Sequence, residues 1–284
     1  MKKLIYFILL TSLSLNAQEI DYTKLKGAYL GQKLPNIEPE LFAPGIVSTE
    51  NGNHSSPTLT PDGKEIYWSM KNKIWYSIET QKGWSIPKAI TFTDDPKYLF
   101  DNPFISPDGC KLFFTKYPYV KDEYQKEMIW FSIREGKDWS EPIALSPVVN
   151  EMSLHWSISV SKKGNLYFGS SSDIYCSKYI DGKYSKPAKL SSTINTEYLE
   201  MCPCIAADES YIIFNRLYET PKNSGIFISF KDKEGKWKEP VFIVGGSPEK
   251  GGVSPRITPD EKFLFFVNGS KGTKWMLADF LANK

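Results

Sequence analysis

Apolar and polar positions alternate along the chain in short runs that turn residues separate. The clearest runs form five similar segments, each with an extended stretch, a turn such as Pro-Asp-Gly and a second stretch rich in aromatic residues. An extended run on each side of a tight turn predicts a β-hairpin. At steps of 46, 55, 45 and 52 residues, the segments begin at Pro57, Pro103, Ile158, Pro203 and Pro255.

The residues after each hairpin repeat as well. A third extended run, a turn with an aromatic residue and a short run that begins with proline follow the first four hairpins. The third runs begin at Ile74, Ile129, Ile174 and Ile226, and the fourth at Pro87, Pro142, Pro187 and Pro240. Proline is tolerated in a fourth strand because an outermost strand leaves one edge unpaired. Four strands in a unit of about 50 residues predict one blade of a β-propeller.

The fifth unit has a hairpin and a third strand near Trp275, but no fourth strand follows. A matching strand stands at the other end of the chain, at Pro39–Phe42, 18 residues before Pro57. We expect this N-terminal strand to join the C-terminal blade and close the ring, which removes free sheet edges. The sequence therefore predicts an all-β fold over residues 36–284, a five-bladed β-propeller of four-stranded antiparallel blades.

The repeated motif resembles a known family. Pro103-Phe-Ile-Ser-Pro-Asp-Gly, followed later by Trp139-Ser-Glu-Pro-Ile-Ala-Leu, is similar to the WD40-like Pro-Asp (PD40, TolB-type) propeller repeats. These occur in Tol-associated periplasmic proteins and beside peptidoglycan-associated outer-membrane domains. The resemblance runs from about Pro35 to the C-terminus and implies a scaffold that binds proteins or cell-envelope material. The turns depart from the motif at Lys162-Lys163-Gly164 and at Asp208-Glu209, and no peptidoglycan-binding domain follows.

The first seventeen residues have the pattern of a secretory signal peptide. Two lysines precede an apolar run from Leu4 to Leu10, and a small-residue exit ends at Ala17. The run is about half as long as a membrane span. The first cysteine is Cys110, so the leader offers no acceptor for a lipid. We expect residues 1–17 to be removed, residues 18–35 to form a linker, and the protein to be periplasmic or secreted, neither a lipoprotein nor inserted in a membrane.

The charge balance argues against nucleic-acid binding, and the cysteine spacing argues against disulfides and a zinc knuckle. The chain has 35 basic and 33 acidic residues, and removal of the two leader lysines makes the numbers equal. Nucleic-acid binding depends on clustered basic residues, so we exclude that function. The cysteine spacing suits neither a disulfide nor a zinc knuckle, and we interpret all the cysteines as small buried side chains. They are Cys110, Cys176, Cys202 and Cys204.

Candidate site residues follow from the repeat register, because equivalent positions of the first strands converge on the central channel. The only two histidines, His54 and His155, fall on the same repeat position, three residues before the segment start, and Glu200 shares it. These three could form the ligand shell of a divalent metal. Asp101, one place further along, could instead join Glu200 as the carboxylate pair of a glycoside hydrolase. Polar residues at such positions also satisfy the backbone of neighbouring loops.

Three other residues could contact a ligand. Arg256 is an arginine among channel-lining positions, where its planar fork could hold a carboxylate or sulfate, or pair with an acid of the next blade. Trp156 and Tyr198 lie beside the channel-mouth positions and do not recur in the other units, which favours contact with a ligand such as a sugar.

The leading hypothesis is an exported, non-enzymatic β-propeller, without a cofactor, that binds a glycan, a small ligand or an envelope protein at the channel mouth. Two alternatives stay open. One is a glycoside hydrolase-like enzyme that uses Asp101 and Glu200, and the other is a metal-dependent propeller that uses His54, His155 and Glu200.

Overall fold

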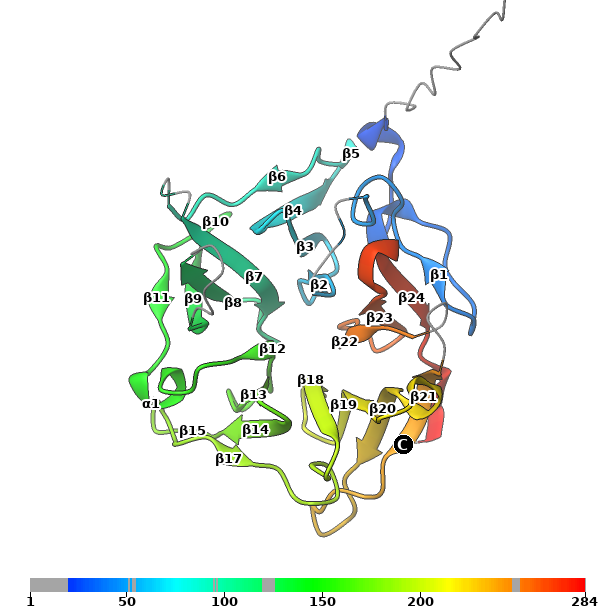
Figure 1. The fold of residues 1–284 in the computed structure, drawn as a ribbon. Helices are drawn as coiled ribbons and strands as arrows, with labels where there is room; N and C mark the ends of the chain where they lie inside the picture. The colour runs from blue at the N-terminus through cyan, green and yellow to red at the C-terminus, as the bar shows by residue number, and fades with distance from the viewer. Residues whose placement is uncertain are drawn as a thin grey trace, which may run out of the picture.

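Five small antiparallel sheets stand around a central axis in the computed structural model (Figure 1). The structure describes residues 20–50, 52, 55–93, 95, 97–118, 126–246 and 251–283. The predicted signal peptide and His54 lie outside these residues. The prediction of a five-bladed β-propeller with antiparallel blades is confirmed.

Each blade is built in chain order from the axis outward, so the first strand of every blade faces the channel. Blade one contains β2 (Thr58–Leu59), β3 (Glu65–Met70), β4 (Lys73–Thr80), β5 (Gly83–Trp84) and β6 (Lys88–Ala89). Blade two contains β7 (Tyr98–Ile105), β8 (Lys111–Pro118), β9 (Met128–Glu135), β10 (Asp138–Trp139) and β11 (Ile143–Ala144). Blade three contains β12 (Trp156–Val160), β13 (Leu166–Ser170), β14 (Asp173–Ser177) and β17 (Ala188–Lys189), with a separate hairpin of β15 (Tyr179–Ile180) and β16 (Lys183–Tyr184).

The last two blades have the same plan. Blade four contains β18 (Leu199–Ile205), β19 (Tyr211–Leu217), β20 (Gly225–Phe230) and β21 (Val241–Gly245). Blade five contains β22 (Val253–Ile257), β23 (Phe263–Val267), β24 (Thr273–Leu277) and, from the N-terminal end, β1 (Glu40–Leu41). Glu40 pairs with Trp275 and Leu41 with Lys274 in that sheet.

Helical segments are short and lie in the connections. They are η1 (Tyr22–Lys24), η2 (Tyr29–Gly31), α1 (Pro147–Asn150), η3 (Pro221–Asn223), η4 (Gly269–Lys271) and η5 (Asp279–Asn283). Within the part of the chain that the structure describes, no helix has the length and apolarity needed to cross a bilayer.

Five apolar clusters hold the ring together, one at each interface between neighbouring blades. Successive side chains of a strand point to opposite faces of the sheet, so a second strand with consecutive aromatic residues serves two interfaces at once. Phe113 packs toward blade three and Phe114 toward blade one. Phe265 and Phe266 divide in the same way between blades one and four. The aromatic-rich runs of the repeat are therefore the interblade core.

The N-terminal segment, predicted as a linker, lies against blades one and five from Ile20 onward. The backbone N–H of Trp84 donates to the carbonyl of Leu25 at 2.9 Å, and its indole N–H donates to that of Gly27 at 2.8 Å. On the other side the Tyr29 hydroxyl donates to a carboxylate oxygen of Asp260 at 2.8 Å. The segment thus bridges the first and last blades beside β1.

The first strands of blades two to five each contain a β-bulge directly before the position where the repeat segment starts. The register shifts there in all four strands, and a non-glycine residue has a positive φ of 49–57°. These residues are Asn102, Ser157, Cys202 and Ser254. The bulge inserts one extra residue, so side chains before it do not keep the alternation that holds after it.

All four cysteines are free thiols, as the spacing predicts. Cys202 and Cys204 are buried and Cys176 is partly buried. The prediction of burial is wrong for Cys110, which is exposed because it follows the hairpin turn at Gly109.

Candidate functional site

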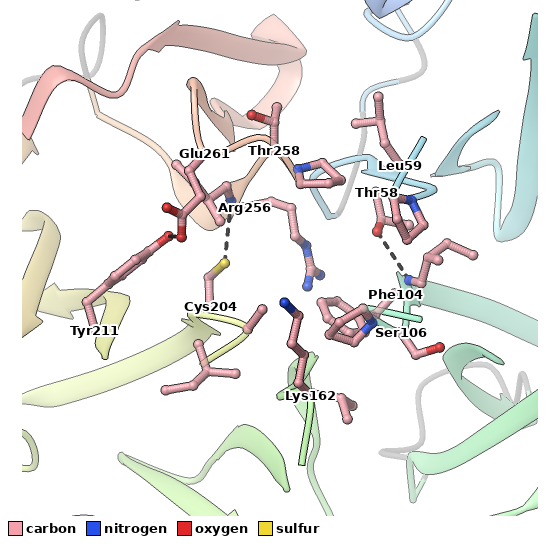
Figure 2. A pocket seen from close by; sticks show the side chains of 18 residues that line it. Thr58, Leu59, Phe104, Ser106, Lys162, Cys204, Tyr211, Arg256, Thr258 and Glu261 are labelled. Atoms are coloured by element: carbon pink, nitrogen blue, oxygen red, sulfur yellow. Dashed lines mark hydrogen bonds between the residues drawn. The ribbon is translucent and has the colours of Figure 1, made fainter. Parts of the chain in front are cut away.

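A cavity of about 250 Å³ occupies the central channel at the end where the first strands finish (Figure 2). All five blades line it, because it takes the last residue of every first strand and part of the turn that follows. The strand residues are Leu59, Ile105, Val160, Ile205 and Ile257. The mouth of this cavity is therefore formed by the hairpin turns of the five repeats.

The residue directly after each segment start differs in role between the blades. In blades one, three and four its side chain accepts a hydrogen bond from a backbone N–H of the next blade, at 3.2, 2.9 and 3.4 Å for Thr58, Ser159 and Cys204. These side chains join neighbouring blades. Blades two and five carry Phe104 and Arg256 at the same position, and both side chains extend into the cavity (Figure 2).

Arg256 is only 3% exposed, and its guanidinium crosses the channel. Nη1 donates to the carbonyl of Ile158 in blade three at 2.8 Å, and the centroid of the Phe104 ring lies 4.7 Å from Cζ of Arg256. Nε and Nη2 are buried without a hydrogen-bond partner among the described residues. Burial lowers the pKa of this guanidinium, because a charged group loses hydration there. Arginine nevertheless stays protonated at neutral pH, so the cavity contains a positive charge.

The first residue of each hairpin turn lines the same cavity as the Arg256 guanidinium. It is proline in three blades, but blade three has Lys162 and blade four has Ala207. Lys162 is exposed at the mouth, and Figure 2 shows its amine pointing toward the guanidinium of Arg256. The one acid among the described residues of the cavity lining, Glu261, accepts a hydrogen bond from the Tyr211 hydroxyl at 2.9 Å. Two converging cations in an otherwise largely apolar wall suit an anionic group.

Asp101 lies in the first strand of blade two, on the far side of the bulge from the cavity. Its buried Oδ1 accepts hydrogen bonds from the hydroxyls of Ser69 and Ser55 at 2.5 and 3.0 Å, and from the N–H of Asn102 at 2.6 Å. These three contacts occupy Oδ1 within the protein itself. The residue belongs to a polar cluster at the beginning of the first strands.

Glu200, the proposed partner of Asp101, is fully buried and bound to its own neighbours. Arg216 Nε donates to its Oε1 at 2.7 Å, and Thr196 contributes its hydroxyl at 2.6 Å and its backbone N–H at 2.9 Å. Glu200 thus satisfies neighbouring groups of the protein, which is the other role that the sequence allowed for a polar residue at this repeat position. Asp101 and Glu200 therefore have separate sets of partners.

His155 is also fully buried, and its ring points into the protein rather than the channel. Nδ1 lies 3.0 Å from the carbonyl of Glu127 and Nε2 lies 3.2 Å from that of Val149. Burial lowers the pKa of the imidazole. Within the described ranges, no three His, Cys, Asp or Glu side chains gather closely enough to hold a metal ion. The predicted set with His54 cannot be assembled from described residues.

Trp156 and Tyr198 lie on the end of the ring away from the cavity. Trp156 begins β12 and pairs with Gly169, where it is partly buried. The Tyr198 ring packs 4.4 Å from that of Tyr218, centroid to centroid, in a surface groove of about 610 Å³ that also contains Glu197. Of the predicted residues that the structure describes, only Arg256 lines the channel cavity.

Sequence reasoning missed Glu127, which is half-buried just before β9. Its Oε2 has no hydrogen-bond partner among the described residues, and burial raises its pKa to about 7, with a further contribution from the negative charge of Asp101. It also missed Phe104 and Lys162. Their signal was present in the printed sequence, since each stands where the other repeats have a smaller residue or a proline.

Comparison with known proteins supports the architecture. No family model matches the chain, and no curated protein matches it. Among solved structures, a TolB protein from Agrobacterium tumefaciens matches with a TM-score of 0.50 at 16% identity, over 79% of this chain and 77% of that one. The chain has a β-propeller fold.

Enzymes with the same fold match equally well. A gluconolactonase from Xanthomonas campestris has a TM-score of 0.50 at 10% identity, over 88% of this chain and 98% of that one. A thermostable family-43 glycoside hydrolase has a TM-score of 0.51 at 13% identity, over 79% and 89%. At such low identities the likeness concerns the fold, and the chemistry must be argued from the side chains.

Proposed function

We propose that this protein is an exported, non-enzymatic propeller of the Pro-Asp repeat type, and that it binds an acidic ligand in its central channel. The observation that carries the proposal is the buried guanidinium of Arg256, two of whose nitrogens have no partner among the described residues. A buried charge is costly unless it is paired. A carboxylate or sulfate would supply both the counterion and the missing acceptors, in a bidentate geometry that arginine favours.

The cavity fits a recognition role. Apolar residues and prolines form most of its wall, and a few polar groups converge at one point, as in typical small-molecule sites. Lys162 at the mouth would attract an anion, and Arg256 deeper in the channel would orient it.

Thermal unfolding of the purified protein with a panel of small acids tests the proposal. Acetate, gluconate, glucuronate and sulfate would be compared with neutral glucose. We expect at least one anion to raise the melting temperature, because a ligand at 100 times its Kd stabilises the folded state by about 2.7 kcal/mol. Glucose should have no effect.

Matched variants assign that effect to the channel. Arg256→Gln should abolish the shift, whereas Arg134→Gln should keep it, since Arg134 pairs with Glu65 outside the channel at 2.7 Å. Full stabilisation of Arg256→Gln by the same anion, or no shift with any anion, would overturn the proposal.

A second candidate function is hydrolysis, and Glu127 is the observation that favours it. Burial raises the pKa of Glu127 to about 7 and the Asp101 carboxylate contributes to that rise, so the two side chains are candidates for the pair of carboxyl groups that a glycosidase needs. Release of reducing sugar from a polysaccharide panel tests this candidate. Asp101→Asn and Glu127→Gln should each abolish turnover, and turnover that survives in both would exclude the pair.

A further inference from the structure

The channel cavity does not end at its mouth but continues into a groove between blades two and three. The groove has a volume of about 370 Å³ and shares Ser106, Pro107, Val160 and Lys162 with the cavity. The cavity alone is smaller than the usual ~300–1,000 Å³ of a small-molecule pocket, and the two together fall within that range. An occupant of the full site must therefore be longer than a single small acid.

The outer part of the groove presents an aromatic surface. Tyr179 is 37% exposed, and its ring centroid lies 4.9 Å from that of Tyr184 on the other strand of the β15–β16 hairpin. This hairpin is a separate two-stranded sheet, apart from the main sheet of its blade. The aromatic faces thus stand at the outer end of a path that begins at Arg256.

Neighbouring residues fix the position of Tyr179. Its backbone N–H donates to Oδ1 of Asn165 at 2.9 Å, and the Asn165 amide donates to Glu209 at 2.7 Å. Gly164 has a φ of +83°, and a Cβ on it would lie 2.9 Å from the Tyr179 ring. The turn Lys162-Lys163-Gly164, which departs from the Pro-Asp motif, therefore both supplies a cation and makes room for the ring.

Charge along the groove is mainly positive. Lys162 stands at the junction with the channel, and Lys111 lies further out with its amine 5.8 Å from the Tyr179 ring centroid. The one acid in the groove lining, Asp108, accepts hydrogen bonds from the Ser106 hydroxyl and the N–H of Cys110 in its own turn, at 2.5 and 2.9 Å. Cations, hydroxyls and exposed aromatic faces in one groove suit an acidic carbohydrate, whose rings stack on tyrosine while its hydroxyls take hydrogen bonds.

The geometry points to an acidic oligosaccharide as the ligand, with a uronate carboxylate at Arg256 in the channel and a following sugar ring over Tyr179 in the groove. This inference rests on the proposed function and specifies its ligand. Acidic peptides can also bind in aromatic-lined grooves or at clustered cations, so an acidic peptide is the alternative occupant. Here Ser106 and Ser161 line the groove together with the two lysines and Tyr179, and hydroxyls beside exposed aromatic faces suit a polyhydroxylated ring, so we favour the carbohydrate.

Calorimetric titration separates this inference from the proposed function. The probes are glucuronate, a trisaccharide with glucuronate at one end, a neutral trisaccharide and an acidic tripeptide. We expect the acidic trisaccharide to bind at least tenfold more tightly than glucuronate, and the other two probes to bind weakly or not at all. Arg256→Gln should abolish binding of both uronates.

Groove variants complete the test. Tyr179→Ala and Lys111→Gln should each reduce the affinity for the acidic trisaccharide severalfold and leave glucuronate binding unchanged, while Tyr198→Ala, on the other end of the ring, should change neither. If glucuronate binds and the acidic trisaccharide binds no more tightly, the groove does not contribute to binding, whereas the channel proposal still holds. Equal affinity for the tripeptide would overturn the carbohydrate. No binding of any probe would overturn this inference, and the thermal shifts with the other anions would then decide the channel proposal.

Discussion

Arg256 carries a positive charge where hydration is lost and no carboxylate pairs with it among the described residues. Replacement of buried ionic groups by apolar side chains of similar volume is often neutral or stabilising, by up to about 4 kcal/mol. We therefore expect Arg256→Met to unfold at an equal or higher urea concentration than the natural protein, although it binds no anion. A loss of more than 2 kcal/mol would instead make Arg256 a structural residue.

Glu200 shows the opposite behaviour of a buried charge. It forms a pair with Arg216 whose side chains are 0% and 8% exposed. Removal of one partner leaves the other charge buried, which costs about 3–5 kcal/mol. Glu200→Ala should lose stability of that order in chemical unfolding, and the double variant with Arg216→Met should lose less than the two single losses together. Additive losses would show that the pair is not coupled.

The pKa of Glu127 makes stability depend on pH. Burial raises this pKa from 4.5 to about 7, so the folded protein holds the proton more tightly than the unfolded chain does. The contribution of Glu127 to stability is therefore fully present below about pH 4.5 and is lost as the pH rises through about 7. Glu127→Gln should gain about 1–3 kcal/mol relative to the natural protein between pH 4.5 and 8, measured by urea unfolding across that range. A constant difference at all pH values would contradict the assignment.

At the scale of elements, β1 depends on the residue that follows it. Phe42 is fully buried, and its ring centroid lies 4.7 Å from that of Phe265 and 5.0 Å from that of Trp275 in blade five. Phe42→Ala should lower the free energy of unfolding by about 3–5 kcal/mol. Leu41→Ala, on the exposed side of the same strand, should change it by no more than about 0.5 kcal/mol. Similar losses in both would mean that β1 does not hold blade five through Phe42.

The sequence was sufficient to predict the elements because each repeat contains its own strands and turns. The alternation after Pro57 and its equivalents predicts which side chains face the channel, and Arg256 was found in this way. The β-bulge before those positions is not visible as a pattern, since Asn102, Ser157, Cys202 and Ser254 share no residue type. The bulge changes the face of the strand on which the preceding side chains lie. His155 and Glu200 precede it, so their shared repeat position did not predict where their side chains point.

The same bulge explains part of the rest, because it sets the register in which Glu200 lies opposite Arg216 in the β18–β19 hairpin. Contacts between segments explain the remainder, since nothing local indicates that the imidazole of His155 lies between two carbonyl groups. Departures from the repeat were the better guide. Lys162, Phe104 and Arg256 each break the pattern of their position, and all three line one cavity.

At the scale of the whole molecule, the last blade takes its outermost strand from the opposite end of the chain, where Glu40 pairs with Trp275. A ribosome makes the N-terminal end first, so this strand must wait for the final blade before it has a partner. The earlier blades can stack in order as they appear, but the apolar face of blade one, with Leu59, Ile66 and Trp68, lacks its contacts with the aromatic residues of blade five until then. Assembly thus ends when β1 pairs with β24, and a chain truncated before Trp275 is left with an open ring that exposes apolar surface.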